Sequence, residues 1–262
     1  MAVRRRIAVL SAALLAASTA VLTQTRPSFE VASIKRNQSL DDAGSWQIQP
    51  GGRFRAINAP VFWLVMNAYG EFQRTLLESQ VVGAPDWLWA EHYDIVAKTA
   101  EDVAKMPQPE QLRAIPKLIQ SLLEDRFKLQ AHRETRRLPI YALTFARKDH
   151  ALGPKLTRSS LDCAKETTKC GFNGARGHMI GGALQMLTLA NVLQSLSERV
   201  VVDKTGLEGL FDVDLEYSPD QTATDKPSIF AAVQEQLGLK LEADSGPVDV
   251  VVIDHIERPT ED

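Results

Sequence analysis

Phe211-Asp212-Val213-Asp214-Leu215-Glu216-Tyr217 alternates strictly between apolar and acidic residues. Successive side chains of a β-strand point to opposite faces of the sheet, so this stretch predicts a strand with one buried and one solvated face. An earlier stretch, Tyr93-Asp94-Ile95-Val96-Ala97, opens with the same order of aromatic, Asp and β-branched residues. Strands of this kind are typical of antiparallel sheets that expose one face to water.

The elements around these two strands follow the same order in each half of the chain. A helix that begins near Pro60 comes before the first strand, and a helix over about 110–127 follows it. In the second half, a helix over 186–196 comes before and a helix that begins at Pro227 follows. The other predicted strands are 29–35, 53–57, 128–133, 140–146, 200–203, 239–241 and 248–253. We therefore predict an α+β fold of two related units, each with mainly antiparallel strands and two helices, produced by internal duplication. The alternative is a chance match, because helices and strands alternate in many proteins.

The predicted units are separated by a segment of different composition. Residues 27–150 form the first unit, residues 183–262 form the second, and residues 151–182 lie between them. The intervening segment holds both cysteines and, between 171 and 182, five glycines. Polar, glycine-rich segments are typical of surface loops, so we predict a linker here.

The first 20 residues are predicted to be a signal peptide. Arg4, Arg5 and Arg6 precede an apolar run over 7–22, and small residues lead to a cleavage site after Ala20. The run is shorter than the roughly 20 residues that span a bilayer as a helix, although an uncleaved anchor is the alternative. No later apolar run approaches that length. We therefore expect a mature chain without a membrane span, in the periplasm or outside the cell.

Composition and charge argue against two classes of partner. The chain has 262 residues with 30 basic and 33 acidic side chains, and removal of residues 1–20 leaves 27 basic and 33 acidic ones, a net charge of −6. Domains that bind nucleic acid carry clustered positive charge, so no nucleic-acid partner is expected. An acidic chain also lacks a general attraction to anionic lipid.

Cys163 and Cys170 are the two cysteines of the chain, and they lie in a polar stretch. In an oxidising compartment such a pair is predicted to form a local disulfide. A redox pair and half of a metal site are the alternatives, but redox pairs usually have two intervening residues, and zinc would need two further ligands. We expect neither a metal nor another cofactor.

Several longer strings resemble one known family. They are Phe29-Glu-Val-Ala-Ser-Ile-Lys, Gly51-Gly-Arg-Phe, Arg126-Phe-Lys-Leu, Val202-Asp-Lys-Thr-Gly-Leu and Glu235-Gln-Leu-Gly-Leu-Lys-Leu. The chain resembles a soil-associated, exported family of uncharacterised proteins, a domain of unknown function expanded in Acidobacteria. Relatives of that domain occur fused to membrane sensor-peptidases, which implies an extracytoplasmic sensing or binding role. The family has no established catalytic residues to transfer. A weaker resemblance, over residues 53–70, is to the short N-terminal interaction module of secretins and TonB-dependent receptors.

Two polar strings are candidates for chemistry. Asp212, Asp214 and Glu216 share one face of their predicted strand, which could hold a hard cation, but one strand presents them in a row, whereas a calcium site needs converging ligands. Asp203 and Lys204 form a possible acid–base or ligand-binding pair. The alternative for this string is a turn in which Asp203 bonds its own backbone. The chain has no Gly-x-Ser-x-Gly, Ser-x-x-Lys or His-Glu-x-x-His motif, so no catalytic residue is predicted.

Aromatic residues are concentrated between residues 62 and 93. Trp and Tyr favour binding surfaces because they supply a large contact area at low entropic cost. Trp87 and Trp89 follow Pro85 in a predicted loop, and they are the candidates for an exposed platform. Packing over the first unit is the alternative.

The sequence therefore predicts a non-catalytic module of the cell envelope that binds or senses a small extracytoplasmic ligand or an envelope protein. The predicted binding residues are Trp87, Trp89, Asp203 and Lys204, and a groove between the two units is a further candidate site. One alternative is an envelope hydrolase at the same groove that uses Asp203, Lys204 and His178. Another is a structural partner of a secretin-like or receptor assembly.

Overall fold

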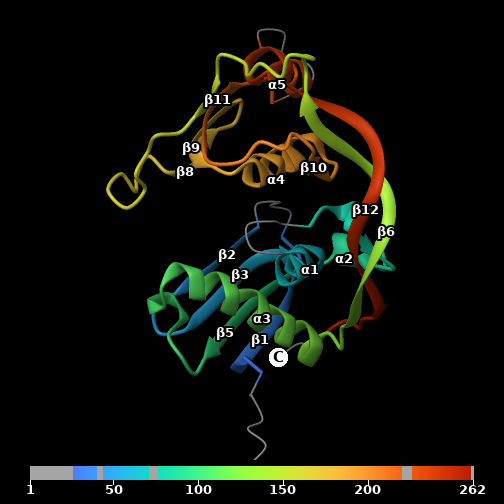
Figure 1. The fold of residues 1–262 in the computed structure, drawn as a ribbon. Helices are drawn as coiled ribbons and strands as arrows, with labels where there is room; N and C mark the ends of the chain where they lie inside the picture. Colours follow the sequence, from blue (N-terminus) through green and yellow to red (C-terminus); the bar gives the residue numbers. More distant parts are fainter. Residues whose placement is uncertain (1–25, 40–43, 71–75, 220–225, 261–262) are drawn as a thin grey trace, which may run out of the picture.

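The computed structural model describes residues 26–39, 44–70, 76–219 and 226–260. The predicted signal peptide, residues 1–20, lies outside the described residues. Within them the chain folds as an α+β protein in which most strand pairs are antiparallel, as predicted. Figure 1 shows a lower lobe from the first half of the chain, an upper lobe from the second half, and two long strands between them.

The first lobe is built on a four-stranded antiparallel sheet. Its strands, in their order across the sheet, are β1 (Phe29–Asn37), β5 (His92–Thr99), β3 (Arg53–Pro60) and β2 (Ser45–Gln49). Two helices, α1 (Val61–Tyr69) and α3 (Gln108–Arg126), pack on one face of this sheet. The predicted alternation is confirmed, because Phe54 and Ile95 are fully buried against the helices while Arg55 and Val96 are exposed on the other face. Three short elements complete the lobe: η1 (Glu78–Gln80), α2 (Trp87–Ala90) and η2 (Val103–Lys105).

The second lobe repeats this order of strands. Its sheet runs β7 (Leu156–Arg158), β11 (Phe211–Glu216), β9 (His178–Leu184) and β8 (Gly171–Ala175). The helices α4 (Met186–Ser197) and α5 (Ile229–Leu237) pack against it. The two sheets share one topology when their strands are counted along the chain. The fourth strand (β5 or β11) lies between the first and the third, and the second strand (β2 or β8) lies at the edge beside the third.

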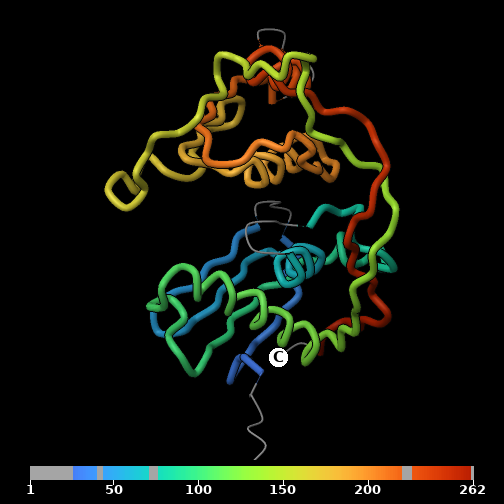
Figure 2. The backbone as a smooth tube through the Cα atoms, in the orientation of Figure 1, coloured from blue at the N-terminus to red at the C-terminus, as the bar shows by residue number. Residues whose placement is uncertain are grey.

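A long two-stranded ribbon joins the lobes. The strands β6 (Gln130–Phe145) and β12 (Leu239–His255) pair antiparallel along their whole length, from Leu239 opposite Phe145 to His255 opposite Gln130. The short strands β4 (Val81–Val82) and β10 (Val201–Asp203) add in parallel to β12 and β6 respectively. Figure 2 shows the two ribbon strands running side by side from one lobe to the other.

The ribbon corrects one part of the prediction. The stretches 128–133 and 140–146 were predicted as separate strands, as were 239–241 and 248–253, but each pair belongs to one continuous strand. The polar residues between them interrupt the hydrophobic pattern because they lie at the exposed middle of the ribbon. These residues still lie in register with the opposite strand, as Thr135 does with Asp249.

The segment 151–182, predicted as a linker, contains β7, β8 and the first part of β9. Three of its glycines, Gly153, Gly174 and Gly182, lie where backbones approach closely: a Cβ atom at Gly182 would lie 2.0 Å from the carbonyl oxygen of Lys169. The glycine-rich composition therefore accompanies strands rather than a free loop.

Candidate functional site

The acidic strand β11 places its carboxylates on the outer face of the second sheet, as the alternation predicts. The three groups have separate partners. Asp212 Oδ1 accepts a hydrogen bond from the backbone N–H of Ala183, at 2.9 Å. Asp214 contacts Lys155 and His178, and Glu216 lies 3.8 Å from the Nζ of Lys226. The row does not converge on one point, and among the described residues no group of three or more His, Cys, Asp or Glu side chains is placed to hold a metal ion.

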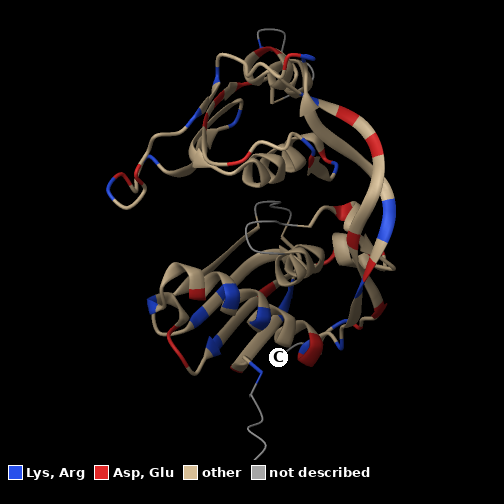
Figure 3. Cartoon of the chain, in the orientation of Figure 1, with Lys and Arg blue, Asp and Glu red and all other residues tan. Residues whose placement is uncertain are grey.

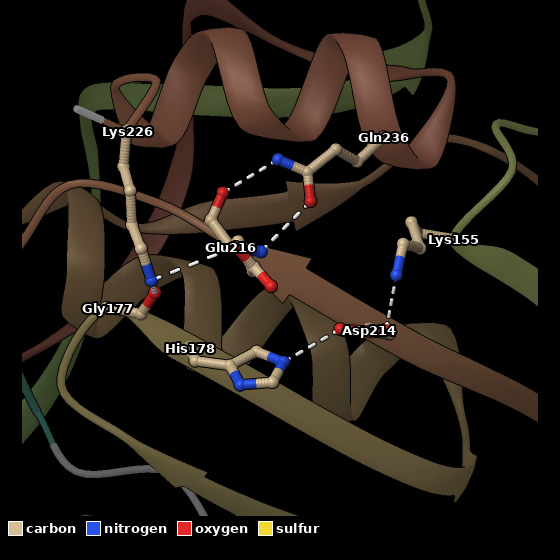
Figure 4. Close-up of polar contacts among 7 residues, drawn as sticks. All are labelled: Lys155, Gly177, His178, Asp214, Glu216, Lys226 and Gln236. Carbon is tan, nitrogen blue, oxygen red and sulfur yellow. Dashed lines mark hydrogen bonds and ion pairs between the residues drawn. The ribbon is translucent and has the colours of Figure 1, made fainter.

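Asp214 is the centre of a polar cluster whose members lie far apart in the sequence. Lys155 Nζ donates to its Oδ2 at 2.5 Å, and His178 Nε2 lies 2.8 Å from its Oδ1 (Figure 4). Two hydrogen bonds lower the pKa of Asp214, and the bond from Lys155 has a larger effect than the bond to His178. The contact between Lys155 and Asp214 also raises the pKa of Lys155. A carboxylate held ionised between two partners is a weak base, so the geometry favours a structural role for this cluster.

The cross-strand register was the missing signal for this cluster. His178 lies opposite Glu216 in the β9–β11 pair, which makes it a diagonal neighbour of Asp214. Beside it, the amide of Gln236 bonds both backbone groups of Glu216, accepting from its N–H at 2.9 Å and donating to its carbonyl at 2.7 Å (Figure 4). These contacts tie α5 to the end of β11.

The residues predicted for a hydrolase are not brought together. Asp203 Oδ1 accepts hydrogen bonds from the backbone N–H and the hydroxyl of Thr205, at 2.9 and 2.7 Å, so this string forms the turn that was the alternative. Lys204 Nζ instead contacts Asp244 on the ribbon, at 2.7 Å. His178 belongs to a different sheet and contacts Asp214. The geometry therefore provides no acid–base set from these three residues.

Trp87 and Trp89 lie in α2 and are partly buried. The ring of Trp89 stacks on Phe62, with centroids 4.7 Å apart, and the Arg258 guanidinium lies 5.1 Å from the centre of the Trp87 ring. Both side chains pack against the core of the first lobe. Their arrangement agrees with the packing alternative, and a binding role for them stays a prediction.

Cys163 and Cys170 form a disulfide, as predicted, with their Cα atoms 5.7 Å apart. Cys170 directly precedes β8, which is the edge strand of the second sheet. The closed loop therefore fixes the start of a strand that has a partner, β9, on one side.

The edge of β8 adjoins an open groove of about 390 Å³. Phe172 and Gly174 form one wall, and one face of α4 forms the other, with Thr188, Asn191, Val192, Ser195 and Leu196 at helical spacing. Every residue of β8 is exposed, and the Phe172 side chain is 48% exposed. On its outer side, β8 pairs with no strand of the described chain. An unpaired edge beside a helix face of this kind is a template for an added strand.

The sequence is similar to one known family. A family model described as "Protein of unknown function (DUF3738)" matches residues 63–256. The chain belongs to the DUF3738 family. The DUF3738 match runs from within α1 to the end of β12, so it includes the second sheet, both ribbon strands and the groove beside β8.

No curated protein and no solved structure is significantly similar to the chain. The predicted kinship to a domain of unknown function is confirmed, while the link to soil and to Acidobacteria stays a prediction. No helix in the described ranges is long and apolar enough to cross a lipid bilayer.

Proposed function

We propose that this protein is a non-catalytic binding module that captures an extended segment of a partner protein along β8. The observation that carries the proposal is the fully exposed edge strand beside the α4 groove. Native proteins usually protect such edges with Lys, Pro or a covering element. The sequence Gly171-Phe172-Asn173-Gly174-Ala175 has none of these residues. The equivalent edge strand in the first lobe, β2, is contacted by η2, and three of its five residues are partly buried.

The surroundings of β8 indicate the chemistry of the captured segment. Its backbone would continue the ladder of the sheet, and an apolar side chain would fit between Phe172 and Val192. Arg176 lines the groove at the end of β8, and Lys226 donates to the carbonyl of Gly177 at 3.1 Å (Figure 4). Lys226 also lies 3.8 Å from Glu216, so the Arg176 guanidinium is the cation that favours a carboxylate in the segment, from Asp, Glu or a chain terminus.

Selection of peptides from a random display library tests the proposal. We expect selected peptides to share an apolar residue close to an acidic one and to perturb the backbone amide signals of β8 and α4. The variant Phe172→Lys should weaken their binding at least tenfold, because it puts a charge in the apolar part of the groove. Gln47→Lys on the exposed edge of β2 is the matched control and should change little. Peptides that bind both variants equally, or that perturb other elements, would contradict the proposal.

We also propose that the protein works outside the cytoplasm, in the periplasm or in the medium, as part of the cell envelope and in a sensing role. The disulfide supports this location, because disulfides persist in oxidising compartments. The sequence of residues 1–20 supports export. Expression with a C-terminal tag, followed by mass determination of the exported product, tests it. A mass that retains residues 1–20 would contradict cleavage after Ala20.

We infer that the two lobes arose by internal duplication. The shared strand order supports this inference, and so do the two ribbon strands, each of which receives a short parallel strand from the other half of the chain. A residue-level match adds to it. Asp94 accepts a hydrogen bond from the N–H of Asn58 at 2.8 Å, as Asp212 does from Ala183, and both Asn58 and Ala183 have positive φ.

A further inference from the structure

The outer face of the first sheet carries four exposed basic side chains and one partly buried carboxylate, that of Asp94, which lies opposite Lys35. No helix of the described lobe packs on this face, because α1 and α3 both pack on the other side. We define the basic face by its exposed residues, which are Val31 and Lys35 on β1, Arg53 and Arg55 on β3, and Val96 and Lys98 on β5. None of the four cations forms a side-chain ion pair or hydrogen bond with the rest of the described chain. Figure 3 shows basic residues on the strands of this lobe.

The register opposes two of these cations in a way that reduces the stability of the sheet, whereas Lys35 lies opposite Asp94. Arg53 lies directly opposite Lys98 in the β3–β5 pair. Like charges at directly opposed positions destabilise a sheet. The valines are also unusually exposed, at 68% for Val31 and 54% for Val96. Neither feature helps the lobe to fold, which points to a surface that contacts something else.

The arrangement specifies a flat anionic partner. Side chains two residues apart on a strand are separated by about 7 Å and point the same way, so the charges spread over a plane instead of converging on a compact anion. The aromatic residues of β1, β3 and β5, which are Phe29, Phe54 and Tyr93, pack in the core on the other face. The basic face therefore lacks the aromatic platforms on which sugars or single-stranded bases stack.

We propose that the basic face docks the protein onto an anionic lipid bilayer, with Val31 and Val96 at the headgroup level and the second lobe held away from the membrane. Each Lys or Arg near such a surface adds attraction that is screened within about 8 Å at physiological salt. The net charge of −6 expected for the mature chain argues against an anionic partner. Salt screens the charges of distant residues, however, so the attraction to the membrane depends on the charges of the basic face itself. This contact is independent of strand capture at β8, since the two surfaces lie on different sheets.

Co-sedimentation with lipid vesicles tests the proposal. The protein would be the chain from residue 21, because the apolar run over 7–22 would itself bind lipid. We expect binding to vesicles of phosphatidylcholine with 30% phosphatidylglycerol, little binding to pure phosphatidylcholine, and loss of binding at high salt. The triple variant Arg53→Gln, Arg55→Gln and Lys98→Gln should reduce binding at least tenfold. Its melting temperature should equal or exceed that of the unmodified protein, because an opposed like-charge pair is removed.

A second triple variant provides a control of the same charge. Arg113→Gln, Lys117→Gln and Lys148→Gln removes three exposed cations away from the basic face and should leave vesicle binding within about twofold. Equal losses in the two triple variants would show a general charge effect and overturn the proposal. So would retention of poly-L-glutamate by a protein that does not bind the anionic vesicles, because the partner would then be an acidic polypeptide.

Discussion

A single aspartate in each half of the chain has a role that its position on a solvated strand face conceals. Asp94 and Asp212 are the first acidic residues of the two stretches with the shared aromatic–Asp–aliphatic pattern. Each accepts a hydrogen bond from the backbone N–H of a residue with positive φ, Asn58 or Ala183, near the end of the neighbouring strand. At each point the pairing register shifts just before α1 or α4 begins. The aspartates therefore fix the bend from which each of these helices starts.

The neighbouring carboxylates Asp212 and Asp214 should differ in their importance for stability. Asp212→Ala should lower the free energy of unfolding by roughly 1–3 kcal/mol, because it leaves the partly buried N–H of Ala183 without an acceptor. Asp214→Ala should cost less than about 1 kcal/mol, because its partners Lys155 and His178 are exposed side chains. Urea denaturation of both variants measures the difference. Equal costs would contradict a special role for Asp212.

At the scale of elements, polar side chains contact one another across the two strands of the ribbon, at the end that adjoins the first lobe. His132 on β6 contacts Asp254 on β12, with Nδ1 and Oδ2 2.7 Å apart, and Glu134 on its own strand at 3.1 Å. The hydrogen bond to Asp254, followed by that to Glu134, raises the pKa of His132 above its ordinary value. The charged imidazole therefore stabilises the folded state.

This contact predicts a pH dependence of stability. Because the folded-state pKa of His132 is raised, its contribution is complete below the unfolded pKa of about 6.5 and is lost as the pH rises through the folded value. His132→Gln should therefore lower the melting temperature more at pH 5.5 than at pH 9. Asp254→Asn should reduce the same pH dependence. The account would be contradicted if the unmodified protein and His132→Gln differed in melting temperature by the same amount at both pH values.

Elements with a strong hydrophobic period were predictable from the sequence, and elements defined by pairing were not. The spacing of Leu118, Leu122 and their neighbours predicts α3, and strict alternation predicts β11. In contrast, β8 has no buried residue and no alternation, because it is held by its ladder to β9 alone. The groove beside it was therefore invisible in the sequence. The same holds for the His178–Asp214 contact, which depends on the register between β9 and β11.

At the scale of the whole molecule, the ribbon makes the two lobes parts of one folding unit. Ala131 on β6 packs against the core of the first lobe, and Val251 on β12 lies in it. Leu143 on β6 and Leu239 on β12 lie in the core of the second. A smaller cluster of Ile140, Val200 and Val248 lies between them. Both long strands contribute residues to both cores. Neither lobe is therefore formed by a single continuous segment of the chain.

Unfolding should therefore be a single cooperative transition, and the tryptophans allow this to be measured. All four, Trp46, Trp63, Trp87 and Trp89, belong to the first lobe, so their fluorescence reports on that lobe alone. Leu215→Ala removes a fully buried side chain from the second core and should cost roughly 2–5 kcal/mol. We expect it to lower the urea midpoint equally by tryptophan fluorescence and by far-ultraviolet circular dichroism, which reports on both lobes. If the lobes were independent, Leu215→Ala would leave the fluorescence midpoint unchanged while the circular dichroism curve became biphasic. Ile95→Ala, in the first core, is the reciprocal variant, and it should also shift both signals together, because the shared ribbon makes both cores unfold as one unit.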